Sequence, residues 1–185
     1  PLPLGYYQYN LNTIRRFKVI LKALFLIAIS VLSYGCESTK TLILSNQLQA
    51  SFASPKSYIH TYNSLIFKYD GWWISHEVID STRLYPSLDL GDNFRPFLRS
   101  IFQPELNSTL PENLVKLSSE QRKFFEIADR NIIKKDISGA EVLGFYDEEK
   151  KKGYIFVLED LLVHRIDTSS NKKSFHTLLN SIRVR

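Results

Sequence analysis

The sequence predicts an α+β fold in which an antiparallel β-sheet carries helices packed on it. Three observations predict it: a turn signal between two strand-like runs, a change to two-residue periodicity late in the chain, and a closing amphipathic helix. The resulting order of hairpin, helix, meander and helix is typical of α+β domains. A hydrophobic content of 44% in 185 residues is sufficient for one packed domain.

The first strand-like region is the most ambiguous. Residues 37–56 are polar and rich in serine, which is typical of a tether. Inside this segment, however, residues 41–44 form a short apolar run that is long enough for a first edge strand. Both interpretations remain open from the sequence.

The clearest local signal is a predicted β-hairpin over residues 64–78. Two runs of aromatic and β-branched residues flank Asp70-Gly71, and this pair favours a type I′ turn with positive φ at both positions. The register makes one face nearly all apolar, and that face is expected to point to the core. On the other face Lys68 opposes Trp73.

An aromatic side chain on the polar face of a hairpin has two interpretations. Aromatic side chains around this hairpin most often belong to a core, but aromatic strips also bind sugars or peptides. An exposed indole beside a lysine would indicate a contact surface. Trp73 and Lys68 are therefore the candidate contact residues.

The middle of the chain contains breakers followed by helix signals. Residues 86–111 contain four prolines and are predicted to be irregular. Thr109 with Glu112 forms a potential capping box around Pro111, and Ser118 with Gln121 forms a second. The helix that follows is expected to bury an apolar side made of Phe124, Phe125, Ile127 and Ala128.

From residue 132 onward the apolar period is two, and the sequence predicts a meander. The strands are expected at residues 132–137, 141–147, 153–158 and 161–167. A charged hairpin loop at 148–153 and a tight turn at Glu159-Asp160 separate the later strands. A helix beginning near Lys172 closes the chain. Its buried stripe is Phe175, Leu178, Leu179 and Ile182.

The positive charge belongs mainly to the beginning of the chain. Residues 1–35 hold Arg15, Arg16, Lys18 and Lys22 and no acidic residue, so residues 36–185 carry a net charge of only +1. A nucleic-acid partner would require a basic face on the domain itself, and none is expected.

The first 35 residues have the layout of a signal sequence. A cationic segment precedes the apolar run 23–32, which is shorter than the roughly 20 residues of a spanning helix. The run ends in Leu32-Ser33-Tyr34-Gly35-Cys36, which resembles the lipobox of bacterial lipoproteins. The resemblance implies lipid attachment at Cys36 and a membrane partner through the acyl chains. Ser33 departs from the pattern, which usually has leucine there.

Two other fates of this segment remain open. Ser33-Tyr34-Gly35 also satisfies the small-x-small rule of ordinary signal peptidase, which would leave a soluble periplasmic protein. An uncleaved anchor is the third interpretation of the apolar run. If the lipid is attached, Glu37 instead of Asp after the cysteine favours the outer membrane over the inner membrane. The expected organisation is a signal sequence at 1–35, a lipidated cysteine with tether or first strand at 36–57, and one α+β domain at 58–185.

The hairpin and the closing helix carry a second resemblance. Phe67-Lys68-Tyr69-Asp70-Gly71-Trp72 resembles the F-x-Y-P-x-G-W strand and turn of PsbP-like proteins, with Asp70 in place of the usual proline. The stretch from Ser174 to Arg183 is similar to their closing helix. The resemblance implies an α/β/α sandwich and a non-enzymatic accessory role. Its motifs are structural, so it transfers no catalytic residue.

No motif in the sequence predicts a catalytic, metal or cofactor site. The four histidines lack metal-ligand spacing, and the adjacent His76 and Glu77 point to opposite faces of a strand. A Gly-x-Ser-x-Gly elbow and a glycine-rich phosphate loop are both absent from the sequence. Residues 150–152, three consecutive lysines, are expected to form a solvated hairpin tip, with contact to anionic lipid as the alternative.

Two functional hypotheses follow. The first is an envelope-tethered accessory or binding protein that supports an envelope protein partner. The second is a small envelope hydrolase. A flat face carrying Trp73 would favour the first hypothesis, and an apolar pocket with a perturbed histidine or aspartate among converging polar groups would favour the second.

Overall fold

The computed structural model describes residues 38–79, 88, 90–128, 131–159 and 162–185. All of them except Ser38 belong to a compact unit that spans Thr39–Arg185. Cys36 and the expected signal sequence lie outside the described residues.

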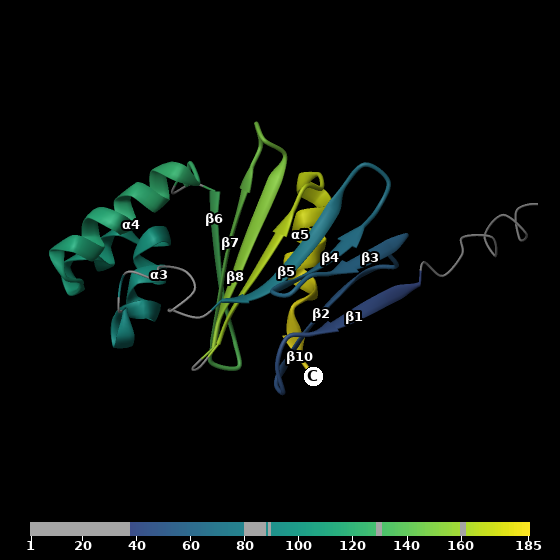
Figure 1. Ribbon diagram of the computed structural model, residues 1–185, viewed down its shortest axis with the longest axis horizontal. Coiled ribbons are helices and arrows are strands. Elements are labelled where there is room, and N and C mark those ends of the chain that lie inside the picture. Colours follow the sequence, from purple (N-terminus) through teal and green to yellow (C-terminus); the bar gives the residue numbers. More distant parts are fainter. Residues whose placement is uncertain (1–37, 80–87, 89, 129–130, 160–161) are drawn as a thin grey trace, which may run out of the picture. The chain divides into compact units, whose positions relative to one another are not determined.

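A seven-stranded antiparallel sheet is the centre of the unit (Figure 1). Its strands follow the order β3-β4-β5-β9-β8-β7-β6. Their bounds are β3 Ser57–His60, β4 Ser64–Lys68, β5 Trp73–Ile79, β6 Ile132–Ile137, β7 Ala140–Asp147, β8 Lys152–Leu158 and β9 Val163–Thr168. The four strands predicted late in the chain are therefore present, and the antiparallel sheet with packed helices confirms the α+β prediction.

A second sheet has three strands in the order β1-β2-β10, which are Thr39–Ile43, Leu48–Ala53 and Arg183–Val184. Residues 41–43 of the apolar run thus lie in β1, so the strand alternative describes this segment. The sequence analysis missed β2 and β10, as well as β3 in the larger sheet.

Helices lie on both faces of the larger sheet (Figure 1). Their bounds are α3 Phe94–Phe102, α4 Glu112–Phe124 and α5 Lys172–Ser181, with short 3-10 turns at Gly91–Asn93 and Pro104–Thr109. The pair α3 and α4 packs on one face, over side chains such as Phe145 and Phe156. On the opposite face α5 and β2 pack over Val142, Ile155 and Ile166.

The predicted hairpin is confirmed, but its turn type differs. Phe67 pairs with Ile74 and Lys68 with Trp73, as the register predicted. Only Gly71 of the turn adopts a positive φ, +76°, whereas Asp70 does not. The turn is therefore not type I′, and its conformational demand falls on Gly71 alone.

Helix α3 corrects the prediction that residues 86–111 are irregular. Pro96 lies in the first turn of this helix, where a missing N–H removes no helical hydrogen bond. Phe97, Leu98, Ile101 and Phe102 recur at helical spacing and are all buried. A proline near a helix start is therefore compatible with a helix that a proline further inside would break.

Helix α4 also departs from its prediction at both ends. Its N-cap is Pro111 with no side-chain cap, and the Thr109 hydroxyl donates to the Leu106 carbonyl instead, so the first capping box is wrong. Ser118 lies inside the helix, where its hydroxyl accepts from that of Ser100, so the second box is wrong too. The helix ends at Phe124, which is exposed, so residues 124–128 do not form one side of a helix, although Phe125 and Ile127 still pack into the core.

The closing helix agrees with its prediction. It begins at Lys172, and the Asn171 side chain caps it by accepting from the Ser174 amide at 2.9 Å. All four stripe residues are buried: Phe175, Leu178, Leu179 and Ile182. Within the described part of the chain, no helix is long and apolar enough to cross a membrane.

Candidate functional site

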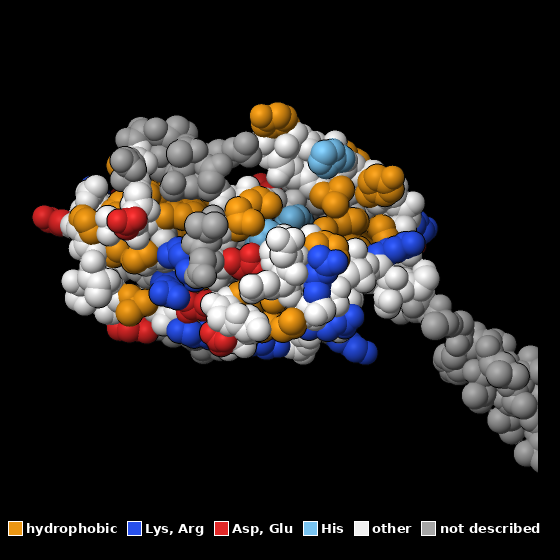
Figure 2. All heavy atoms as spheres, turned by 90° about the horizontal axis from the view of Figure 1, so that it is seen from below, with side chains coloured by type: hydrophobic (Ala, Val, Ile, Leu, Met, Phe, Trp, Pro, Cys, Tyr) orange, Lys and Arg blue, Asp and Glu red, His pale blue; other side chains and the backbone are white. Residues whose placement is uncertain are grey.

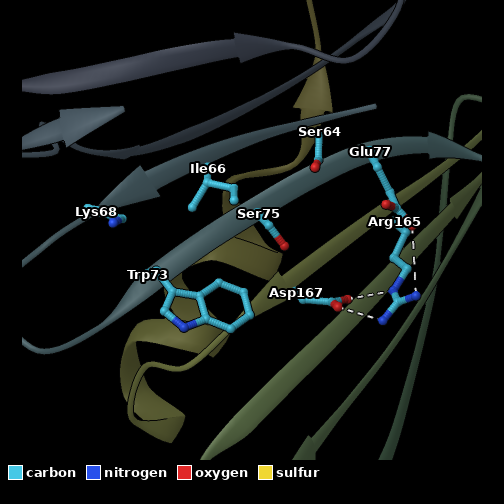
Figure 3. A pocket seen from close by; sticks show the side chains of 8 residues that line it. All are labelled: Ser64, Ile66, Lys68, Trp73, Ser75, Glu77, Arg165 and Asp167. Carbon is cyan, nitrogen blue, oxygen red and sulfur yellow. Dashed lines mark hydrogen bonds and ion pairs between the residues drawn. The ribbon is translucent and has the colours of Figure 1, made fainter. Parts of the chain in front are cut away.

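The face of the sheet that carries α3 and α4 is covered only in part. The helices pack mainly on β7 and β8, whereas β4, β5 and β9 line an open cavity of about 370 Å³ (Figure 3). We call this cavity the groove. Its lining residues are Ser64, Ile66, Lys68, Trp73, Ser75, Glu77, Arg165 and Asp167.

Strand register brings the groove residues together. Lys68 pairs with Trp73 across β4 and β5. On the other side of β5, Ser75 pairs with Asp167 and Glu77 with Arg165. Because alternate residues of a strand share one face, these side chains line the same surface. The two residues predicted from sequence, Trp73 and Lys68, are therefore placed side by side in the groove.

Trp73 is held by its backbone. Its amide donates to the Ser169 hydroxyl at 3.0 Å. Its carbonyl accepts from the Thr168 hydroxyl at 3.0 Å and from the Ser169 amide at 3.1 Å. The neighbouring Trp72 instead stacks on Tyr69, with ring centroids 3.8 Å apart, and packs against the core. The two adjacent indoles thus lie in different surroundings: Trp72 packs against the core, and Trp73 lines the groove.

Arg165 and Asp167 form the polar end of the groove (Figure 3). Arg165 donates from Nε and Nη2 to the two carboxylate oxygens of Asp167, at 2.8 and 2.6 Å. Oε1 of Glu77 lies 3.8 Å from Nη1 of Arg165. Cζ of the guanidinium also lies over the Phe125 ring, 5.8 Å from its centroid. Burial alone lowers the pKa of Arg165, but Asp167 and Glu77 raise it overall, so the guanidinium stays charged.

The sequence analysis did not identify Arg165, Asp167 or Glu77 as site residues. A usable signal existed in β9, where Arg165 and Asp167 alternate with the apolar Ile166. Such alternation places the two charged side chains on the face opposite Ile166. What the sequence did not reveal is that β9 lies next to β5 in the sheet.

Two histidines lie on the opposite face of the same strands. His76 Nε2 and His164 Nδ1 are 3.1 Å apart, and Glu159 Oε2 is 3.8 Å from His164 Nε2. Burial, with the neighbouring His164, lowers the pKa of His76 to about 4. The remaining carboxylate oxygen of Glu159 accepts from the Ser45 hydroxyl at 2.6 Å. This buried chain of polar groups ties the β1–β2 turn to the larger sheet.

Other charged groups are arranged mainly as structural pairs. Glu141 is 6% exposed and accepts from Arg99, Gln103 and Lys134. At the tip of the β7–β8 hairpin, Lys150 pairs with Glu126 at 2.7 Å. Among the described residues, no group of three or more His, Cys, Asp or Glu side chains could hold a metal ion.

The face of the molecule seen in Figure 2 is not dominated by charge of one sign. Acidic and basic side chains are interspersed there, with hydrophobic side chains between them.

Comparisons of the chain with protein-family models, with curated proteins and with solved structures found no match. The groove is therefore the basis of the proposed function.

Proposed function

We propose that this protein is an envelope-tethered binding protein with an accessory role, and that the groove is its binding surface. The observation that carries the proposal is an indole, on a hydrogen-bonded backbone, that lines a sheet face the helices leave open. A cavity of about 370 Å³ lies within the roughly 300–1,000 Å³ range of small-molecule sites. Binding to a prearranged surface loses less entropy than binding to a mobile one.

The alternative of a small hydrolase has less support. A hydrolase of the serine type needs a nucleophile within hydrogen-bond reach of its base. Both histidines with a lowered pKa, His76 and His164, point away from the groove, on the other face of the sheet. Within the described ranges, neither of them hydrogen-bonds a serine hydroxyl, and they contact each other instead.

Attachment to the membrane is proposed from the expected signal sequence and Cys36. Only Glu37 and Ser38 separate Cys36 from Thr39, the first residue of β1. Acyl chains on Cys36 would thus hold the domain within a few residues of the membrane surface, and more than one chain makes such an anchor stable. We prefer the outer membrane over the inner membrane because Glu37 follows the cysteine.

A PsbP-like accessory role belongs to the same proposal. The quoted hairpin motif contains Trp72 and Gly71, and the closing helix packs on the sheet as α5. Helices on both faces of the sheet are compatible with the α/β/α sandwich that the resemblance implies. An accessory role would use the groove to hold a ligand or an envelope protein partner without transforming it.

The binding proposal is tested by affinity purification of the tagged protein from detergent-extracted membranes. Trp73→Ala should remove the co-purifying molecules that the wild type retains. Tyr58→Ala is the matched control, because Tyr58 is an exposed aromatic on the opposite face of the same sheet. Equal recovery from the Trp73 and Tyr58 variants would show that the groove is not the binding surface.

The anchoring proposal is tested separately by cell fractionation. Cys36→Ser should move the protein from membranes to the soluble periplasmic fraction. The intact mass of the wild type should also show acyl chains on the cysteine. If the Cys36→Ser protein resists a carbonate wash of the membranes, an uncleaved anchor explains the localisation better than acylation.

A further inference from the structure

We propose that the ligand of the groove is a neutral saccharide. The inference rests on the proposed function, because it names the ligand class of the same surface. Its basis is the hydrogen bonds and apolar area that the lining residues can offer a ligand, and the contacts that they already make with one another.

The charges that line the groove cancel. Lys68 and Arg165 are basic, and Glu77 and Asp167 are acidic. Arg165 is engaged by both carboxylates, since Asp167 takes two of its N–H groups and Glu77 lies 3.8 Å away. At the Arg165 end of the groove a charged ligand would therefore have to displace an existing partner, and because the lining as a whole carries no net charge its electrostatic gain would be small. This disfavours phosphate groups and strongly anionic polymers.

A purely apolar ligand is also disfavoured. It would exclude water from Glu77, Arg165 and Asp167 without supplying hydrogen bonds, and burying polar groups in this way is costly. Ile66 and Trp73 are the apolar side chains among the lining residues, and the other six lining side chains end in polar or charged groups. The groove therefore requires a ligand that carries hydroxyl groups as well as an apolar face.

A sugar ring meets both requirements. Its hydroxyl groups donate and accept, so they can bridge a guanidinium and a carboxylate without breaking the pair. The Ser75 hydroxyl has no hydrogen-bond partner among the described residues and faces the same cavity. The C–H face of a sugar can lie on the Trp73 indole, whose backbone is hydrogen-bonded to Thr168 and Ser169.

The test is isothermal titration calorimetry on the detergent-solubilised full chain. The neutral probes are maltotriose, cellotriose and tri-N-acetylchitotriose at millimolar concentration. We expect saturable binding of at least one of them, abolished by Trp73→Ala and unchanged by Tyr58→Ala. Ser75→Ala should weaken binding about fivefold, which corresponds to one lost hydrogen bond of about 1 kcal/mol. Circular dichroism establishes that each variant is folded.

Two further probes separate the inference from the function on which it rests. Inorganic phosphate stands for anionic ligands, and the dye anilinonaphthalene sulfonate stands for apolar ones. Trp73-dependent binding of either probe with no saccharide binding overturns the ligand class and leaves the groove as the binding surface. No response to any probe, combined with Trp73-dependent capture of a protein, overturns the saccharide in favour of a protein partner. No Trp73 dependence in either assay overturns both proposals.

Discussion

His76 and His164 form a partly buried pair in which Nε2 of the first lies 3.1 Å from Nδ1 of the second. Only one proton fits between these two nitrogens. Since Glu159 lies beyond Nε2 of His164, we assign the proton of His164 to Nε2, so that Nδ1 accepts from His76. In this arrangement both rings are neutral, and adding a proton to the pair places a charge in the interior.

This pair predicts a loss of stability in mild acid. The pKa of His76 is about 4 in the folded state, and the pKa of His164 is also lowered, whereas an unfolded histidine titrates near 6.5. Between these values the unfolded chain binds more protons, so the free energy of unfolding falls as the pH is lowered from about 6.5 toward 4. Urea unfolding at a series of pH values measures this slope.

The slope should become shallower in His76→Gln, which removes one titrating group. His60→Gln is the control, because His60 is exposed and should leave the slope unchanged. Glu141 does not obscure the result, since its pKa is lowered from 4.5 and its contribution is lost below that value. An identical slope for wild type and His76→Gln would show that the pair does not control acid stability.

The turn at Gly71 provides a second prediction. Gly71 has φ +76°, and a Cβ built there meets no atom within 4 Å, so a substitution is strained by its backbone and not by crowding. Gly71→Val should lower the free energy of unfolding by about 1–2 kcal/mol, while Gly71→Asn should cost much less because asparagine tolerates positive φ. Equal loss in both variants would indicate that space, and not conformation, limits this position.

Gly153 is limited by space. A Cβ at this residue would lie 2.2 Å from Cδ2 of Phe175, a ring that is itself fully buried. We expect Gly153→Ala to destabilise the domain by about 1–3 kcal/mol, as overpacking does. Adding Phe175→Leu should recover part of this loss relative to the two single changes, which a double-mutant cycle of thermal unfolding detects. Strict additivity of the two effects would refute the contact.

Helix α5 owes its stability to packing, because isolated helices of its length are marginal in water. Leu179 is 1% exposed and should cost about 2–5 kcal/mol when truncated to alanine. Thr177→Ala on the exposed side of the same helix should stay within about 0.5 kcal/mol of wild type. Chemical unfolding measures both. A small effect at Leu179 would mean that the stripe is not part of the core.

The sequence predicted those elements whose signals are local. The hairpin at Asp70-Gly71 and the stripe of α5 each depend on neighbours in the chain, and both are present. The prediction for α3 was wrong because a proline in a first turn looks the same in sequence as a proline that breaks a helix. The capping box at Thr109 failed because Pro111 is the N-cap of the helix, so Thr109 lies two residues before it, where its hydroxyl donates to the Leu106 carbonyl.

The candidate site was predictable only in part for a similar reason. Lys68 and Trp73 are partners within one hairpin, so their proximity follows from a short turn. Arg165 and Asp167 reach the same cavity because β9 pairs with β5, across a sequence separation of about 90 residues. No local pattern encodes that pairing. It depends on which strand order buries the most apolar surface.

The small sheet has a consequence for how the chain folds. Strand β10 pairs with β2, and the Ser51 amide bonds the Ser181 hydroxyl across 130 residues. Contacts between distant segments form slowly, since a long loop must close before they stabilise anything. During synthesis, the three-stranded sheet of β2 is therefore incomplete until β10, at residues 183–184, has been made. A nascent chain stopped before residue 181 should remain sensitive to protease, and the complete domain should acquire resistance in a single late step.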